Sequence, residues 1–480
     1  MTTSFLTISR FDQILKDLRD RIRRADFPMD RRLPSERDLA EQYHCSQPTI
    51  NKVIATLVME QILERRESRG SYVAKEYKTK QQKLQPIKFM GWLGAETIGS
   101  NVWDAVYASF KHRYPNLETL SIDVPYEQFP QRLTQMIGQG QAPDVVQIVN
   151  NWTGHFASLG ALIPLDAKIP DAVVNDHLTW RKHPNQYRGA TYSIDWALSS
   201  TLLFCNHRIM REAGLDPNRP PRTMDELQAM VTQIGTRKLM RDKKPVYGFA
   251  TPTGTGEVTA TYWLSFLFAS GGRLIDENGR VALAAPEAVR ALEFFVSLIT
   301  ASRLPSGMSI WDQRKLFAQD RVGFILDGSM GRGFFRKESG LGVAYDAHFS
   351  AGPIPAGVTG HSETVAHHHS LAVMCQTPHE KESFAFVEHM LSDRTLALRY
   401  YEEEGLIPAR KSLLSLPEYR EPYARLVLEQ AKRAHVLPTE HPNLQIAMVF
   451  LGNAIHRVLN KEMDAASSLS EVARNIELLL

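Results

Sequence analysis

The sequence predicts a multidomain protein in which a small, basic α+β domain precedes a much larger α/β domain. The chain has 480 residues, which is too long for a single hydrophobic core. Residues 1–86 hold 17 Lys and Arg against 12 Asp and Glu, although the whole chain is nearly balanced at 56 against 53. Helices and a short hairpin are expected up to residue 75, whereas strands and helices alternate from residue 87 onward. The excess positive charge is therefore confined to the first domain, as expected if that domain contacts phosphates.

Three helices are expected in the first domain. Residues 8–24 place apolar side chains at helical spacing and arginines on the other faces. A second helix starts at Ser35, where Asp38 completes an acidic form of the capping box. A third helix starts at Ser46, with Pro48 in its first turn, where the missing N–H costs nothing. Two short helices joined by a tight turn indicate a unit that reads DNA.

The third helix has an apolar stripe and, near its start, a polar face. The polar face consists of Gln47, Thr49, Asn51 and Lys52. Gln and Asn can bond adenine through two atoms, and Lys can reach guanine or a phosphate. Two short strands are expected next, joined by a turn at Arg69-Gly70 that requires the positive φ of glycine. This hairpin has Arg65, Arg66 and Arg69 at its tip and would suit the edge of a DNA groove.

Together these segments resemble the GntR family of winged helix-turn-helix regulators. The matching motifs are Leu33-Pro34-Ser35-Glu36-Arg37, Leu39-Ala40, Ser46-Gln47-Pro48-Thr49, Glu64-Arg65-Arg66, Arg69-Gly70 and Tyr72-Val73. With this resemblance, the residues expected at the DNA are Arg37, Ser46, Gln47, Thr49, Asn51, Lys52, Arg69 and Gly70. The family often has arginine where Gln47 and Asn51 stand, so the resemblance does not imply the preferred operator sequence. The alternative is a generic basic helical domain with solvated arginines.

Residues 76–86 are polar, lack an apolar period and are expected to form a linker between domains at 1–75 and 87–480. In the second domain, "IKFMGWLG" is expected to be a buried strand followed by a glycine turn. "APDVVQIVNNW" is expected to be another strand, without alternation, as in a parallel sheet that is covered on both faces. Strands and helices then alternate, which predicts α/β layers.

The second domain resembles the extracellular solute-binding proteins of family 1, the sugar-binding type. The matching segments are 141–166, 200–227, 269–295, 317–330 and 352–414. The resemblance implies a two-lobed α/β domain of the periplasmic-binding-protein type II fold, with a ligand held in the cleft between the lobes. The chain would cross between the lobes near Tyr192–Asn206 and Gly323–Asp327. In the segment 317–330 the family usually ends in Gly-Pro-Trp, whereas this chain has Gly328-Ser329-Met330.

Ligands of open α/β sheets bind beyond the carboxyl ends of the strands. By that rule, and with two further tryptophans, the expected ligand contacts are Trp92, Asn151, Trp152, Asp195, Trp196, Trp263, Trp311, Asp327 and His368. Aromatic faces pack on the C–H faces of sugar rings, and Asp and Asn bond the hydroxyls. Alternatives stay open at several positions: Trp92 and Trp152 could pack loops, Asp327 could form a turn, and Trp263 could belong to the core. The three histidines at 367–369 would point in different directions, so no metal site is predicted.

We interpret the chain as a ligand-responsive transcription regulator without enzyme activity or cofactor. It would bind operator DNA as a homodimer and sense a sugar or oligosaccharide, with a non-sugar solute as the alternative. An aminotransferase-like domain fused to a GntR-type head would need a lysine that binds pyridoxal phosphate, usually as Ser-Lys, and no Ser-Lys pair occurs. A secreted transport receptor is disfavoured because the N-terminus has no apolar signal segment. With Cys45, Cys205 and Cys375 far apart and no apolar run long enough for a membrane, we expect a cytoplasmic protein.

Overall fold

The computed structural model describes residues 10–23, 26–27, 32–66, 70–74, 86–92, 94, 100–179, 185–360 and 362–480. The chain divides into two compact units. The small unit comprises Met1–Ile87 together with Tyr114–Glu118, and the large unit comprises Lys88–Arg113 and Thr119–Leu480. None of the helices in the described ranges has the length and apolar character needed to span a bilayer.

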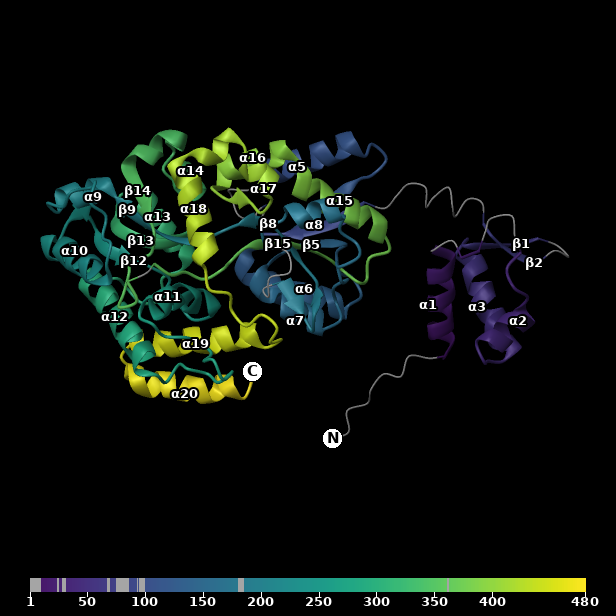
Figure 1. Cartoon of the computed structure of the whole chain (residues 1–480). Helices are drawn as coiled ribbons and strands as arrows, with labels where there is room; N and C mark the ends of the chain where they lie inside the picture. The colour runs from purple at the N-terminus through teal and green to yellow at the C-terminus, as the bar shows by residue number, and fades with distance from the viewer. Residues whose placement is uncertain are drawn as a thin grey trace. The chain divides into compact units, whose positions relative to one another are not determined.

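The small unit is a helical bundle with a two-stranded hairpin (Figure 1). Its elements are α1 (Arg10–Arg23), α2 (Glu36–Gln42), α3 (Gln47–Met59), β1 (Leu63–Arg66) and β2 (Gly70–Val73). The apolar stripes of the helices meet in a core that includes the fully buried Leu18, Leu39, Ile50, Val53 and Leu57. The hairpin is antiparallel, with Arg66 opposite Gly70. This arrangement is the winged helix-turn-helix that the sequence predicts.

The helix starts in the small unit follow the expected local chemistry. The Ser35 hydroxyl accepts from the Asp38 N–H at 3.2 Å, and the Asp38 carboxylate accepts from the Ser35 N–H at 3.1 Å. These two bonds form the predicted capping box. Ser46 precedes α3, and its hydroxyl bonds the Thr49 hydroxyl at 2.8 Å instead of a backbone N–H. Helices α2 and α3 therefore both start where predicted, but the hydrogen bonds of the two serines differ.

The large unit has two lobes, and the first is built on a six-stranded sheet. The strand order is β16-β8-β15-β5-β3-β4. Their bounds are β3 (Ile87–Gly91), β4 (Thr119–Asp123), β5 (Val145–Val149), β8 (Ile194–Leu198), β15 (His369–Val373) and β16 (Ile407–Pro408). β3 and β5 are parallel, but β15 runs antiparallel to both β5 and β8. The sheet is therefore mixed, where the uniform apolar strands suggested a parallel one.

Helices surround this sheet. They are α5 (Ser100–Arg113), η1 (Tyr126–Gln128), α6 (Phe129–Gly138), η2 (Asn150–Trp152), α7 (Thr153–Ser158), α8 (Asp171–Asp176), α15 (Glu380–Ser392), α16 (Arg394–Glu404) and α17 (Lys411–Leu414). A small hairpin of β6 (Gln186–Tyr187) and β7 (Ala190–Thr191) lies beside α7. Every residue of β5 and β8 is buried, because helices cover both faces of the sheet.

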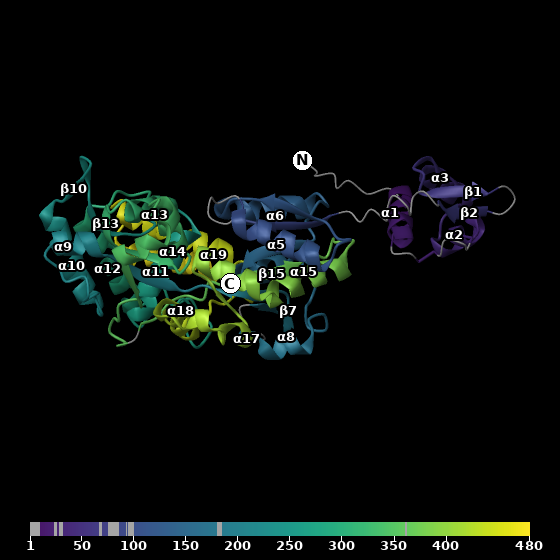
Figure 2. The same cartoon turned by 90° about the horizontal axis from the view of Figure 1, so that it is seen from above.

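The second lobe is built on a four-stranded sheet in the order β12-β13-β9-β14. Its strands are β9 (Thr201–Asn206), β12 (Tyr247–Ala250), β13 (Val322–Gly328) and β14 (Phe349–Gly352). The helices of this lobe are α9 (His207–Glu212), α10 (Met224–Arg237), α11 (Glu257–Ala269), α12 (Pro286–Ser302), α13 (Ile310–Ala318), α14 (Gly331–Glu338) and η4 (Gly342–His348). A hairpin of β10 (Met240–Arg241) and β11 (Lys244–Pro245) follows α10. Figure 2 shows α10 and α12 of this lobe and α5 and α15 of the other at opposite ends of the large unit.

Of the two predicted crossings between the lobes, one lies where it was expected and the other does not. Only two residues, Ser199 and Ser200, separate β8 in the first sheet from β9 in the second, as expected for the first crossing. The second expected crossing, at Gly323–Asp327, is wrong. Those residues lie inside β13, which pairs with β12 and β9 and so stays within the second lobe. The actual return runs through residues 353–368, between β14 and β15.

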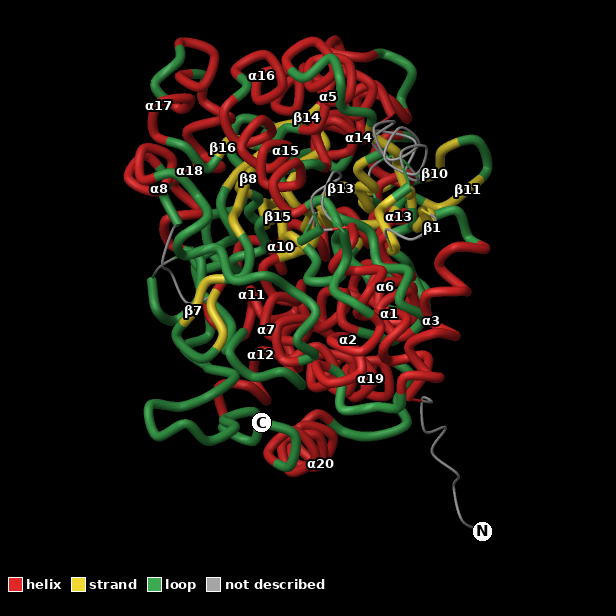
Figure 3. The backbone as a smooth tube through the Cα atoms, turned by 90° about the vertical axis from the view of Figure 1, so that its right-hand side faces the viewer, coloured by secondary structure: helices red, strands yellow, loops and turns green. Residues whose placement is uncertain are grey.

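The C-terminal segment packs against both lobes. It contains η5 (Pro417–Arg420), α18 (Pro422–Arg433), α19 (Leu444–Leu459) and α20 (Ala465–Glu477). α19 packs along α11 and α20, and it also contacts η2 of the first lobe. In Figure 3 α20 lies at the outer edge of the large unit, next to the C-terminus. This segment therefore covers one edge of the space between the lobes.

Candidate functional site

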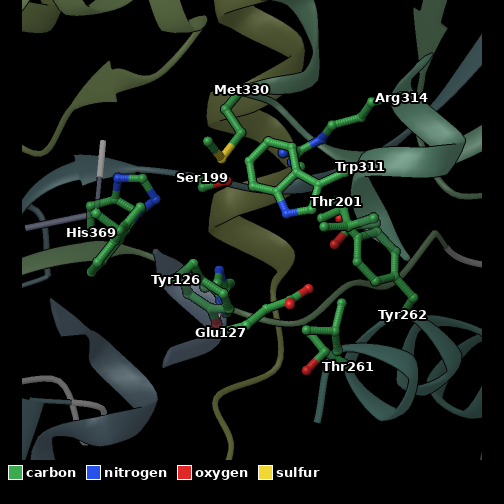
Figure 4. Close-up of a pocket in the computed structure, with 15 residues that line it drawn as sticks. Tyr126, Glu127, Ser199, Thr201, Thr261, Tyr262, Trp311, Arg314, Met330 and His369 are labelled. Atoms are coloured by element: carbon green, nitrogen blue, oxygen red, sulfur yellow. Dashed lines mark hydrogen bonds between the residues drawn. The ribbon is translucent and has the colours of Figure 1, made fainter. Parts of the chain in front are cut away.

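A cavity lies between the two lobes of the large unit (Figure 4). The lining residues are Trp92, Tyr126, Glu127, Ser199, Thr201, Val258, Thr261, Tyr262, Ile310, Trp311, Arg314, Gly328, Met330, His367 and His369. They come from strand ends, from the crossing between β8 and β9, and from α11 and α13. Both lobes therefore contribute to one enclosed site.

Aromatic rings form much of the cavity wall. Trp92 follows β3 and meets Tyr126 and Trp152 edge to face, with ring centroids 5.5 and 5.9 Å apart. Trp311 lies in the first turn of α13, and in Figure 4 its indole projects into the cavity opposite Tyr126, with Met330 on one side. Hydroxyls and carboxylates lie between these rings. The arrangement offers flat apolar faces next to hydrogen-bonding groups, which suits a ring compound with polar substituents.

A buried ion pair supports one side of the cavity. Arg314 Nε and Nη2 donate to the two carboxylate oxygens of Asp327 at 2.7 and 2.8 Å. Asp327 also accepts from the Tyr262 hydroxyl at 3.0 Å and from the Gly328 N–H at 2.7 Å. Its carboxylate is fully buried, whereas Arg314 reaches the cavity wall. Asp327 therefore holds Arg314 and Tyr262 in position from behind the lining.

A much smaller chamber of about 10 Å³, with room for about one water-sized group, adjoins the cavity and shares Tyr126, Thr261 and His367 with it. The Tyr126 hydroxyl lies 3.2 Å from His367 Nε2 and 3.5 Å from Glu257 Oε1. The carboxyl of Glu257 faces this interior, and burial raises its pKa to about 7, although hydrogen bonds from Trp152 and Tyr126 favour the charged form. Burial, together with the neighbouring His368, lowers the pKa of His367 to about 4. We call this space the inner chamber.

Glu257 makes stability depend on pH. Its native pKa lies above the unfolded value of 4.5, so the folded protein binds this proton more tightly than the unfolded chain does. The stabilising effect is complete below pH 4.5 and is lost as the pH rises to about 7. Glu257→Gln removes this dependence. The free energy of unfolding of E257Q relative to wild type is expected to increase by about 1–2 kcal/mol between pH 4.5 and 7, less than the full pKa shift implies because the side chain is only half-buried.

Urea unfolding at several pH values, followed by tryptophan fluorescence, measures this difference. His367 makes the opposite contribution, because its lowered pKa stabilises the fold as the pH rises through about 4 to 6.5. Both proteins share that contribution, so it cancels in the comparison. If the free energies of unfolding of E257Q and wild type differed by the same amount at every pH tested, Glu257 would not be desolvated.

Four of the predicted ligand residues lie at the two cavities. Trp92 and Trp311 line the main cavity, and Asn151 and Trp152 line the inner chamber. Asp327 lies one layer behind the wall, bonded to Arg314. It therefore acts through Arg314 and Tyr262 and not as a direct contact.

The structure places Asp195, Trp196, Trp263 and His368 away from the cavity lining. Asp195 and Trp196 are in the middle of β8, which continues to Leu198, so they are not at a strand end. Asp195 accepts from the hydroxyls of Thr179 and Ser370 in the interior, and Trp196 stacks on Tyr400 with centroids 4.2 Å apart. These positions correct the prediction: the residues that follow the strand, Ser199 and Thr201, reach the cavity instead.

Trp263 and His368 lie away from the cavity lining for different reasons. Trp263 is fully buried in the core of the second lobe, so the alternative reading of it as a core residue is correct. His368 accepts a bond from the Ser199 N–H at 3.4 Å through its Nδ1. Side chains alternate along an extended chain, so the neighbours His367 and His369 line the cavity while His368 does not.

Several lining residues were not predicted from the sequence, among them Glu257, Thr261 and Tyr262 of α11 and Tyr126 of η1. The sequence of α11 is almost wholly apolar and indicated a buried helix. One signal was present: Glu257 and Thr261 are four residues apart and form the polar edge of that helix. Tyr126 had no such signal, because its loop reaches the site only through the tertiary fold.

The small unit presents a second candidate surface. The predicted side chains Arg37, Ser46, Gln47, Asn51 and Lys52 are all exposed, and Thr49 is half-buried. Arg37 lies 3.6 Å from Glu41, in an exposed pair that contributes little to stability.

A concave region of about 1060 Å³ lies between the start of α3 and the hairpin, lined by Arg32, Arg37, Gln47, Arg65, Arg66 and Gly70 among others. Gly70 has φ +96°, as the predicted turn requires, while Arg69 lies outside the described residues. Within this region Glu36 accepts from Arg65 at 2.8 Å. The polar start of α3 and the arginine-bearing hairpin therefore border the same exposed region.

Fold and sites together define the class: a winged helix-turn-helix unit joined to a two-lobed binding unit of the periplasmic-binding-protein type. Residues 11–73 match the family of bacterial regulatory proteins, gntR family, and residues 95–396 match the bacterial extracellular solute-binding protein family. The chain belongs to the solute-binding protein family and carries a GntR regulatory domain at its N-terminus. One matched family contains regulators and the other binds solutes, and neither is a family of enzymes.

Individual proteins show the same two similarities. The maltotriose-binding protein of Pyrococcus abyssi is 22% identical over 365 residues, which cover 74% of this chain and 75% of that protein. The HTH-type transcriptional repressor NagR of Bacillus subtilis is 38% identical over 63 residues, 13% of this chain and 26% of that protein. The structure of maltose-bound T. maritima MalE3 has a TM-score of 0.73 at 22% identity, covering 82% of this chain and all of that chain. The structural similarity establishes the two-lobed fold.

Proposed function

We propose that this protein is a cytoplasmic, ligand-responsive transcription regulator. Its winged helix binds operator DNA, and its two-lobed unit senses a sugar or oligosaccharide in the cavity between the lobes. The observation that carries the proposal is the presence in one chain of an exposed polar helix start beside an arginine-bearing hairpin and of a cavity between two lobes. We further propose that two copies bind a pair of operator half-sites, as winged-helix regulators with symmetric sites do.

Two features support a carbohydrate as the effector. The cavity combines the aromatic rings of Trp92 and Trp311 with the hydroxyls of Ser199, Thr201 and Tyr262. The related proteins from Pyrococcus abyssi and T. maritima are described as binding maltotriose and maltose. Closure of the lobes around a ligand would shift the population toward the closed form, since a ligand acts only through its higher affinity for one state.

A thermal-shift screen combined with gel-shift titration tests this function. Neutral monosaccharides and oligosaccharides are added to the full chain, and a cognate sugar must raise the melting temperature because it binds the folded form. The same sugar is then added to operator complexes selected from random duplex DNA. We expect the sugar to change the affinity of the protein for the operator. A protein that selects no DNA sequence, or whose DNA affinity is unaffected by every sugar that stabilises it, would not be such a regulator.

Lys52→Ala is expected to weaken operator binding and to lower its salt dependence. Lys52 is exposed near the start of α3, where its ammonium can reach a phosphate. Loss of one phosphate contact reduces the slope of log K against log salt concentration by about 0.9. Gel-shift titrations between low and physiological salt measure this slope. Lys461→Ala, which removes the same charge from an exposed position in the large unit, is the matched control.

Gln47→Ala should behave differently from Lys52→Ala. A side chain that bonds a base edge contributes discrimination of about 1–3 kcal/mol without changing the number of neutralised phosphates. Its loss should therefore relax the sequence preference at one base pair and leave the salt slope unchanged. If K52A keeps the wild-type slope, or Q47A keeps full sequence preference, the assignment of this face to DNA is incorrect.

A further inference from the structure

The cavity between the lobes carries little positive charge. Among the lining residues that the structure describes, Arg314 is the permanent cation, and both oxygens of the buried Asp327 neutralise it at 2.7 and 2.8 Å. The carboxyl group of Glu127 in the main cavity adds negative charge, and that of Glu257 in the inner chamber, with a pKa of about 7, adds a partial negative charge at neutral pH. An anionic group of a ligand would therefore meet carboxylates without a cation to balance it.

The histidines of the cavity do not supply the missing positive charge. Burial lowers the pKa of His367 to about 4 and that of His369 well below its usual value. The two imidazoles and His368 lie next to one another, and each would repel a proton on its neighbours. Both lining histidines are therefore neutral at neutral pH and can offer hydrogen bonds but no charge.

The inner chamber is rich in hydrogen-bond acceptors. The Asn151 Oδ1 atom is buried and has no hydrogen-bond partner. Glu257 also lines this chamber, and the Tyr126 hydroxyl lies 3.5 Å from its Oε1 and 3.2 Å from His367 Nε2. Leu444, Gln445 and Met448 of α19 line the chamber as well. A buried acceptor without a donor is costly, so a ligand or water that donates there is stabilised.

We propose that the inner chamber receives a hydrogen-bond-donating group of the effector, either hydroxyls or an amine, and that the cleft as a whole rejects phosphorylated and carboxylated sugars. Asn151 follows β5 of the first lobe, whereas Glu257 begins α11 of the second. A donor bound between them contacts both lobes at once, so binding there favours the closed form. This inference rests on the proposed sugar-sensing function and narrows it to neutral or basic sugars.

Matched sugars that differ in one group test the charge selection. Glucose, galactose and mannose are compared with their 2-amino, uronate and 6-phosphate forms, and with maltose and maltotriose, in thermal-shift titrations of the full chain at constant ionic strength. A neutral or amino sugar should stabilise the protein, and its uronate and 6-phosphate forms should bind at least about 100-fold more weakly, because like charges in a desolvated site repel strongly.

Two variants test the chamber with whichever of these sugars binds. Glu257→Gln and Asn151→Leu each remove an acceptor at similar size, and each should weaken binding by on the order of 10-fold, with E257Q affecting an amino sugar more than its hydroxyl analogue. Glu293→Gln removes one carboxylate from the exposed face of α12 and should leave the affinity unchanged.

The outcomes separate this inference from the proposed function. Tight binding of a uronate or a 6-phosphate sugar would overturn the charge selection but leave sugar sensing intact. Unchanged affinity in both E257Q and N151L would show that the effector does not enter the inner chamber, which overturns the placement. If none of these sugars raises the melting temperature, sugar sensing and the inference that depends on it both fail.

Discussion

Replacing Arg314 with alanine is expected to lower the free energy of unfolding of the large unit by about 3–5 kcal/mol. The substitution leaves the carboxylate of Asp327 buried without its cation, and the Tyr262 hydroxyl and Gly328 N–H cannot offset a full charge. Arg314 also packs its guanidinium over the Trp311 ring, 5.0 Å from the centroid, and that contact is lost as well. The effect should be larger than that of any single exposed ion pair in this chain.

Urea unfolding monitored by tryptophan fluorescence measures this loss. All seven tryptophans lie between residues 92 and 311, so the signal reports on the large unit and not on the winged helix. Asp327→Asn should cost less, because Arg314 lines a cavity and can be hydrated when its partner is neutral. The double variant Arg314→Met/Asp327→Leu, which removes both charges, should recover part of the loss. If R314A were as stable as wild type, Asp327 would not be a buried charge.

Trp263→Ala is expected to destabilise the large unit by about 3–5 kcal/mol, the range for truncation of a large aromatic side chain in a core. Trp263 is fully buried on α11, and its indole N–H has no hydrogen-bond partner. The loss therefore comes from apolar contacts and from the cavity left behind. Thermal and urea unfolding of the apo protein measure it.

Trp263→Phe distinguishes a core role from a ligand contact. Phenylalanine keeps most of the ring volume and removes an unpartnered N–H, so the cost should be below about 1.5 kcal/mol. Because Trp263 does not line either cavity, W263F should keep the wild-type stabilisation by a bound sugar. If W263F bound sugar more weakly but unfolded with normal stability, Trp263 would be a ligand contact.

The small unit shows how much local sequence can predict. The capping box at Ser35 and Asp38, the apolar stripe of α3 and the turn glycine at Gly70 are all present at the expected positions. Each depends on residues a few positions apart, because hydrogen bonds at helix starts and the period of a helix are local properties. The same holds for the strands of the large unit, whose uninterrupted apolar runs indicate burial on both faces.

The residues that line the ligand cavity could be predicted only in part from local sequence patterns. Trp92 and Trp152 were selected because they follow buried strands, and both lie at the two cavities. Asp195 and Trp196 were selected by the same rule, but β8 continues past them to Leu198, and a shift of a few residues moves a side chain from the strand end into the sheet. The residue at which a strand ends is therefore hard to predict from sequence patterns alone.

The sequence by itself determined the class of each unit, the helix starts, the polar face of α3 and the buried strands, because spacing and composition set these features within a few residues. Only the tertiary structure decided which side chains share the cavity. Tyr126 and Glu257 are far apart in the chain and belong to different lobes, yet their side chains lie 3.5 Å apart. Their proximity depends on how two sheets and the crossing segments pack, and no local pattern carries that information.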